Sequence, residues 1–112
     1  MIKLGIRRVK PEEVERLREW MAQVGARRPE VLATFEQEGM RHEQVYLLDV
    51  PDGPILVYAM EAADHERAAK AFLESTLPID VEHRAVMKQV LGGPVRYELL
   101  FDCEASGAGP AT

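Results

Sequence analysis

Residues 2–9 alternate between apolar and polar side chains, and this period of two predicts a β-strand. From Pro11 onward, apolar residues recur every three or four positions, which is the pattern of a long amphipathic helix with one buried stripe. Gly25 and Pro29 interrupt this stripe. We therefore expect either a kinked helix or two helices in tandem, ending before Gly39 as the C′ residue.

Two further apolar runs, residues 42–50 and 55–61, flank the sequence Pro51-Asp52-Gly53-Pro54. Proline, aspartate and glycine favour tight turns, so we expect a β-hairpin here. The second run, Ile-Leu-Val-Tyr-Ala-Met-Glu, lacks polar alternation. Such a run is typical of a central strand that is covered on both faces.

The second half of the chain predicts two more helices and a last strand. Asp64 is placed to cap a short helix, and Asp80 is a second N-cap candidate for the helix that follows. Gly92-Gly93 is expected to end that helix. Residues 95–101 then alternate, which predicts a strand with these side chains facing inward: Val95, Tyr97, Leu99 and Phe101.

The element order is therefore β-α-β-β-α-β, which predicts an α+β domain of ferredoxin-like type. We expect a four-stranded antiparallel sheet with the first and third strands in the middle and all helices on one face. The domain is expected to span residues 1–103, followed by a disordered tail at 104–112. Because the third strand is apolar on both sides, the bare face needs a partner, and we expect a homodimer through the open sheet face.

Composition narrows the classes of function. The 112 residues carry a net charge of −5 with scattered Lys and Arg, which argues against a nucleic-acid-binding face. The one cysteine, Cys103, permits no internal disulfide, so we expect a cytoplasmic protein. The N-terminus lacks a signal-peptide pattern and no apolar run approaches roughly 20 residues, so no membrane association is expected.

Several stretches resemble a known family, and the most specific is Pro78-Ile79-Asp80-Val81-Glu82-His83. The others are Leu4-Gly5-Ile6-Arg7-Arg8-Val9-Lys10-Pro11, Glu30-Val31-Leu32-Ala33-Thr34-Phe35 and the hairpin. Together they are similar to a bacterial family of small proteins classed as a domain of unknown function, within the dimeric α/β-barrel group of ferredoxin-like folds. The resemblance implies a homodimer and a cavity between sheet and helices. The wider group includes cofactor-independent monooxygenases, sugar mutarotases and stress-responsive proteins, so the resemblance implies no single reaction.

His83 is the candidate for catalysis. It lies four residues from both Ile79 and Met87, on the apolar stripe of its helix, and therefore points inward. A histidine facing a cavity could transfer protons near neutral pH. The favoured alternative is a histidine at the edge of the core, bonded to a backbone carbonyl or a carboxylate.

Arg7 and Glu43 are candidates for ligand binding. Arg7 faces away from the apolar side of its strand and could hold a substrate carboxylate, but an ion pair with Glu43 or Glu61 is the favoured alternative. Trp20 adds a ring at the helix surface. Three phenols on the sheet complete the set of ligand-binding candidates: Tyr46, Tyr58 and Tyr97.

Neither a metal site nor a cofactor is expected. The three histidines, His42, His65 and His83, are far apart in sequence, and there is no cysteine pair. No glycine-rich loop of the phosphate-binding kind is present. A bound metal or nucleotide is therefore not part of the hypotheses below.

Three functions remain open. The first is the binding of a small organic ligand between sheet and helices. The second is a cofactor-independent monooxygenase or isomerase in which His83 is the acid or base, Arg7 holds an anion, and a tyrosine shares the pocket. The third is a purely structural dimerisation module, which predicts no pocket of ligand size.

Overall fold

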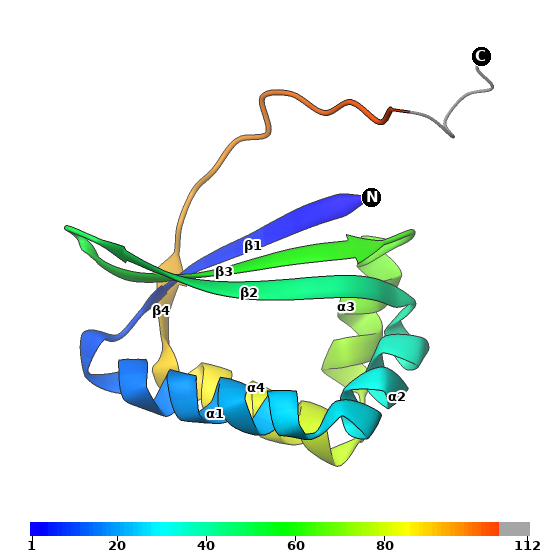
Figure 1. Cartoon of the computed structure of the whole chain (residues 1–112), viewed down its shortest axis with the longest axis horizontal. Helices are drawn as coiled ribbons and strands as arrows, with labels where there is room; N and C mark the ends of the chain where they lie inside the picture. The colour runs from blue at the N-terminus through cyan, green and yellow to red at the C-terminus, as the bar shows by residue number, and fades with distance from the viewer. Residues whose placement is uncertain (106–112) are drawn as a thin grey trace.

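The computed structural model describes residues 1–105, so most of the predicted tail lies outside the described residues. The elements run in the following order: β1 (Ile2–Val9), the short 3-10 helix η1 (Pro11–Glu13), α1 (Val14–Ala26), α2 (Arg28–Glu38), β2 (Met40–Val50), β3 (Gly53–Ala62), α3 (His65–Glu74), α4 (Pro78–Val90) and β4 (Leu91–Pro94) (Figure 1).

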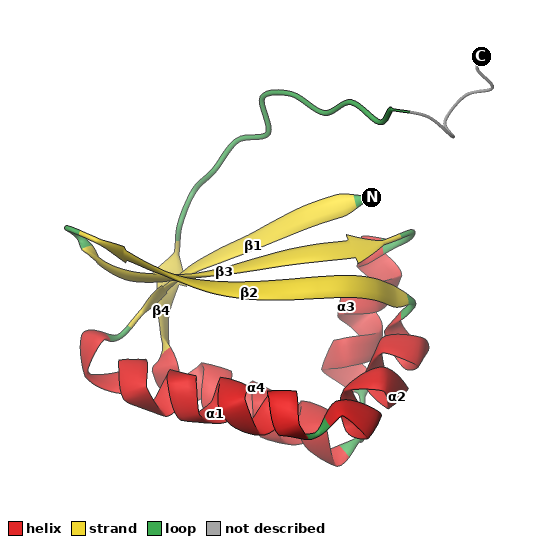
Figure 2. Ribbon diagram, in the orientation of Figure 1, coloured by secondary structure: helices red, strands yellow, loops and turns green. Residues whose placement is uncertain are grey.

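The four strands form one antiparallel sheet in the order β2-β3-β1-β4. All four α-helices lie on one side of this sheet, and the other side carries no helix (Figure 2). The predicted α+β fold of ferredoxin-like type is therefore confirmed, including the central position of β1 and β3. Within the described chain, β3 is covered by helices on one face only.

The long first helical region is two helices in tandem. The break falls at Arg27, whose φ of −110° and ψ of 46° are outside the helical range. Pro29 lies in the first turn of α2, where its missing N–H leaves no hydrogen bond unmade. Gly39 ends α2 with a φ of 73°, a left-handed conformation that glycine adopts without steric cost.

The two predicted N-caps have different outcomes. Asp64 caps α3 as expected, because its carboxylate accepts a hydrogen bond of 3.0 Å from the backbone N–H of Arg67. The prediction for Asp80 is wrong. Helix α4 begins at Pro78, whose fixed φ suits the first helical position, and Leu77 is the N-cap. Asp80 therefore lies inside the first turn, where its side chain is buried.

The predicted last strand is also wrong. The strand β4 starts immediately after α4 and occupies Leu91–Pro94, so the two glycines lie within it. It pairs with β1 only at Arg7 and Val9. Pro94 has no backbone N–H of its own to donate, and residues 95–105 are not assigned to a strand, although the Val95 N–H still donates to the Ile6 carbonyl.

The buried core cluster is formed by side chains of β1, β3, α1 and α4. Its largest side chain is Trp20, which is only 1% exposed, so the expectation of a ring at the helix surface is wrong. The other buried members of this cluster are Val9, Leu17, Leu56, Ile79, Val86 and Val90. Within residues 1–105, no helix combines the length and apolar character needed to cross a membrane.

Candidate ligand cavity

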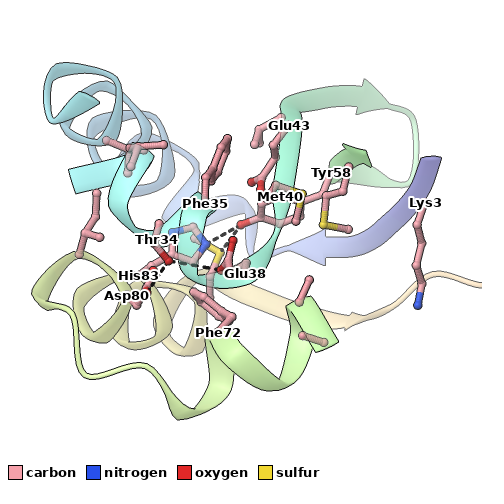
Figure 3. Close-up of a pocket in the computed structure, with 18 of the residues that line it drawn as sticks. Lys3, Thr34, Phe35, Glu38, Met40, Glu43, Tyr58, Phe72, Asp80 and His83 are labelled. Carbon is pink, nitrogen blue, oxygen red and sulfur yellow. Dashed lines mark hydrogen bonds between the residues drawn. The ribbon is translucent and has the colours of Figure 1, made fainter. Parts of the chain in front are cut away.

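A cavity of about 460 Å³ lies between the helix-facing side of the sheet and the four helices. Its walls are mainly apolar, and its inner polar groups come from α2, α4, β2 and β3. The apolar part includes Val31, Phe35, Met40, Met60, Phe72 and Met87. Figure 3 shows Thr34, Glu38, Asp80 and His83 of the helices close to one another, with Glu43 and Tyr58 contributed by the sheet.

His83 connects two aromatic side chains through its ring nitrogens. The Trp20 indole N–H donates to His83 Nδ1 at 2.8 Å, and Tyr58 Oη lies 2.7 Å from His83 Nε2. An indole N–H can only donate, so Nδ1 must be the unprotonated acceptor. The neutral ring then carries its proton on Nε2 and donates it to the tyrosine oxygen.

This geometry disfavours a positive charge on His83. Burial lowers the pKa of His83 to about 4, against a weaker opposite effect from the Asp80 charge. Protonation at Nδ1 would also place two N–H donors against each other, because Trp20 occupies that position. His83 is therefore a neutral hydrogen-bond donor to Tyr58 at physiological pH.

The Tyr58 oxygen accepts the hydrogen bond from His83, so the Tyr58 O–H is free to donate to another acceptor. Burial, with a contribution from the Glu43 charge, raises the pKa of Tyr58 above its ordinary value, so the phenol stays protonated. The Tyr58 hydroxyl also lies 3.4 Å from Met87 Sδ, a weak acceptor. A ligand oxygen in the cavity would be a stronger acceptor for this O–H.

Three carboxyl groups line the same cavity. Thr34 Oγ1 donates to Asp80 Oδ2 at 2.6 Å, and Glu38 Oε2 lies 3.4 Å from the same hydroxyl. Burial, followed by the charges of Asp80 and Glu43, raises the pKa of Glu38 to about 7. The Thr34 hydroxyl is the donor to both carboxyls, and its shorter bond is the one to Asp80.

Glu43 belongs to β2 and faces the cavity next to Met60, its register partner on β3. Burial raises the pKa of Glu43 to about 7, and the negative charge of Asp80 adds to this rise. A carboxyl with this pKa exchanges between its acid and base forms at physiological pH, which suits it to proton transfer.

Arg7 lines the rim of the cavity but does not form the expected ion pair. Its guanidinium donates to the backbone carbonyl of Gly92 at 2.7 Å, and none of the ion pairs among the described residues includes Arg7. Glu61 instead binds the N-terminal amino group at 2.5 Å. The expectation of an Arg7 pair with Glu43 or Glu61 is therefore wrong.

The six site candidates separate into two groups. The structure brings His83, Glu43 and Tyr58 to the cavity, with Arg7 at its rim. Tyr46 and Tyr97 are not among the cavity-lining residues. Tyr46 donates to Gln44 Oε1 at 2.8 Å, and the Tyr97 hydroxyl donates to the backbone carbonyl of Leu4.

The favoured sequence interpretation of His83 is wrong about its partners, which are two aromatic side chains rather than a backbone carbonyl or a carboxylate. Sequence reasoning also placed Trp20 at the helix surface and missed Thr34 and Glu38. A periodicity signal existed for each, because Trp20 lies three residues after the apolar Leu17, and Thr34 and Glu38 continue the apolar face of α2.

Among residues 1–105, no group of three or more His, Cys, Asp or Glu side chains has an arrangement that could hold a metal ion. No curated protein matches the chain. A model of a family of unknown function, DUF6176, matches residues 2–106, which is nearly the whole chain. The chain therefore belongs to the DUF6176 family.

Proposed function

We propose that this protein binds a small, mostly apolar organic molecule through a carbonyl or similar hydrogen-bond acceptor in the cavity between sheet and helices. The observation that carries this proposal is the chain of hydrogen bonds from Trp20 through His83 to Tyr58. Because His83 donates to the phenol oxygen, the Tyr58 O–H remains directed to an acceptor other than the histidine.

The size and walls of the cavity support a small ligand. Pockets for such molecules enclose roughly 300–1,000 Å³, with apolar walls and a few placed polar groups, and this cavity has about 460 Å³. A purely structural module predicts no cavity of this size. The carboxyls of Glu38, Glu43 and Asp80 disfavour an anionic ligand, and Arg7 is already bonded to the backbone at the rim.

The test uses 2-decalone, a saturated bicyclic ketone, and its hydrocarbon counterpart decalin. Binding is followed by the NMR signal of the Trp20 indole N–H, which reports on this cavity because it donates to His83, a residue that lines it. The signal is unambiguous because the chain has a single tryptophan. We expect the ketone to bind the Tyr58→Phe variant about ten times more weakly than the wild type, the loss of roughly one hydrogen bond. Decalin should bind both proteins equally. Equal binding of the ketone to both proteins, or no shift of the Trp20 signal at millimolar ketone, would contradict the proposal.

Glu43 favours a second candidate function, proton transfer next to a carbonyl group. In this step the Glu43 carboxylate removes a proton from the carbon adjacent to the carbonyl, and the C–H electron pair forms the enolate. The Tyr58 O–H donates a hydrogen bond to the enolate oxygen, and protonated Glu43 returns its proton to carbon. His83 then acts as a positioning residue for Tyr58 and not as the acid or base.

This candidate is tested by exchange of the protons adjacent to the 2-decalone carbonyl in D₂O, followed by NMR. We expect the wild type to catalyse the exchange and Glu43→Gln to lose at least about a hundredfold in rate. The matched control is Glu36→Gln, which changes an exposed glutamate of α2 and should leave the rate unchanged. Binding of the ketone without catalysed exchange would refute proton transfer and leave the binding proposal intact.

A further inference from the structure

The helix-free face of the sheet is apolar across three adjacent strands. The registers of β1 with β3 and of β2 with β3 place side chains of all three strands on this face. Ile2 is 70% exposed and Tyr46 is 49% exposed, although both belong to strands of a well-formed sheet. The larger apolar side chains of this open face include Ile2, Leu4, Ile6, Tyr46, Leu48 and Val57. A contiguous apolar surface of this kind marks an interaction site.

A second apolar surface follows β4. Residues 95–105, here called the C-terminal arm, leave the sheet after Val95 N–H donates to the Ile6 carbonyl at 3.2 Å. Leu99, Leu100 and Phe101 are 75%, 84% and 82% exposed, so the chain's own domain does not bury them. The arm rises from the side of the sheet opposite to the helices (Figure 1).

We propose that two copies of this chain pair through their open faces, and that the C-terminal arm of each copy packs on the partner copy. The open face and the arm lie on the same side of the sheet, so one partner can cover both (Figure 1). A two-fold axis uses the same surface on both copies, and each copy therefore supplies the cover that the other lacks.

The exposed area fits a stable dimer. A fully exposed large apolar residue presents roughly 200 Å². With the observed exposed fractions, the open face and the arm together offer roughly 1,000 Å² per copy. A dimer would then bury about 2,000 Å² in total, at the upper end of standard-size interfaces between proteins. The arm supplies about half of this area.

A second copy fits these surfaces better than a lipid bilayer does. The chain carries a net charge of −5, and cellular membrane surfaces are themselves negative. The flat apolar face of a second copy also suits the arm, because the alternating side chains of an extended segment can pack along the strands of a sheet. Vesicle binding by a monomer is therefore a contrary outcome of the test below.

The first measurement is the mass of the full chain in solution at micromolar concentration under reducing conditions, by light scattering. We expect twice the 12.6 kDa of one copy. The double variant Leu99→Asp with Phe101→Asp should raise the dissociation constant of the dimer at least about a hundredfold, because both copies lose two buried apolar side chains. The fold of the single copy should be unaffected, since these side chains are exposed within it.

The matched control is Leu73→Asp, which changes a leucine that is 68% exposed on α3, away from the open face. It should leave the dissociation constant unchanged. A wild type that is monomeric at these concentrations would overturn the proposal, whether or not that monomer binds phosphatidylcholine vesicles. An equal effect of Leu73→Asp and of the double variant would overturn it as well.

A second measurement locates the arm. Cys103 is the single cysteine, is exposed, and belongs to the arm, so a nitroxide label can be attached without another substitution. Labelled chains are mixed with ¹⁵N-labelled Cys103→Ser chains, which report only contacts between copies. We expect broadening of the amide signals of Leu48 and Val57 and none for Leu73. Broadening confined to the helical side, or a dimer without any broadening of the open face, would show that the arm does not pack as proposed.

Discussion

The substitution Glu43→Gln removes a cavity carboxyl whose ionisation destabilises the folded chain. It therefore tests whether the stability of the wild type falls as this carboxyl ionises. The pKa of Glu43 is raised from 4.5 to about 7 in the folded chain, mainly by burial. Below pH 4.5, the carboxyl is protonated in both the folded and the unfolded states, so its burial has no ionisation cost. Between pH 4.5 and about 7, the unfolded chain ionises while burial and the Asp80 charge keep the folded carboxyl protonated, and above about 7 both states are ionised. The wild type therefore loses stability over this range, and glutamine, which cannot ionise, does not.

The magnitude follows from the difference between the two pKa values. A difference of roughly 2.5 units corresponds to about 3 kcal/mol, which is an upper value because the cavity opens to solvent. The variant should also lower the pKa of Glu38, since the Glu43 charge contributes to raising it. At pH 8 we therefore expect Glu43→Gln to increase the free energy of unfolding by about 1–3 kcal/mol. At pH 4 the two proteins should differ by no more than roughly 0.5 kcal/mol.

The assay is urea unfolding at fixed protein concentration, followed by the fluorescence of Trp20, which is buried in the core. Glu36→Gln is the control, because it removes a carboxyl of an exposed residue on α2. The reasoning is refuted if the stability difference between Glu43→Gln and the wild type is the same at pH 4 and pH 8. It is refuted too if the exposed control gives the same pH dependence as the cavity variant.

Further substitutions test the hydrogen bonds of the site and the backbone of the helices. Trp20→Phe removes the indole donor to His83, so it should cost about 1–3 kcal/mol of stability and raise the histidine pKa, as measured by ¹³C NMR of the ring. Gly39→Ala forces a Cβ into a left-handed conformation and should destabilise by about 1 kcal/mol, whereas Gly25→Ala, inside α1 with open space around it, should stabilise by about 0.5–1 kcal/mol in the same urea titration. Thr34→Val removes the hydroxyl that donates to the buried aspartate of α4 and should cost about 1–3 kcal/mol in calorimetry, while serine at this position should recover most of the loss.

The sequence predicted element boundaries correctly where a few neighbouring residues determine the backbone conformation. Gly39 marks the end of α2 because the left-handed conformation is accessible to glycine in particular. The turn at Pro51 and Asp52 joins β2 to β3 because these residues favour the bent backbone of a hairpin. In both places the conformation is determined within four residues, so no tertiary information was needed.

The errors occur where two local signals compete. Asp80 is a good N-cap residue by type, but Pro78 starts α4 two residues earlier and turns the aspartate into a buried acceptor for Thr34. Alternation over residues 95–101 fits a strand equally well inside a sheet or against another molecule. The strand β4 ends at Pro94 and only the Val95 N–H bonds the β1 backbone beyond it, a tertiary limit that sequence periodicity does not include.

In the candidate site, the sequence predicted the position of His83 but not its protonation state. Helical periodicity was sufficient to direct His83 inward, because the period of α4 fixes its face. The protonation state of the ring depends instead on Trp20, 63 residues earlier, and on Tyr58 from the sheet. A lone inward histidine suggests a base, but an indole donor on Nδ1 makes the same residue a neutral donor. The proposed acid–base chemistry therefore moves to Glu43 and Tyr58, whose register across β2 and β3 is determined only when the sheet forms.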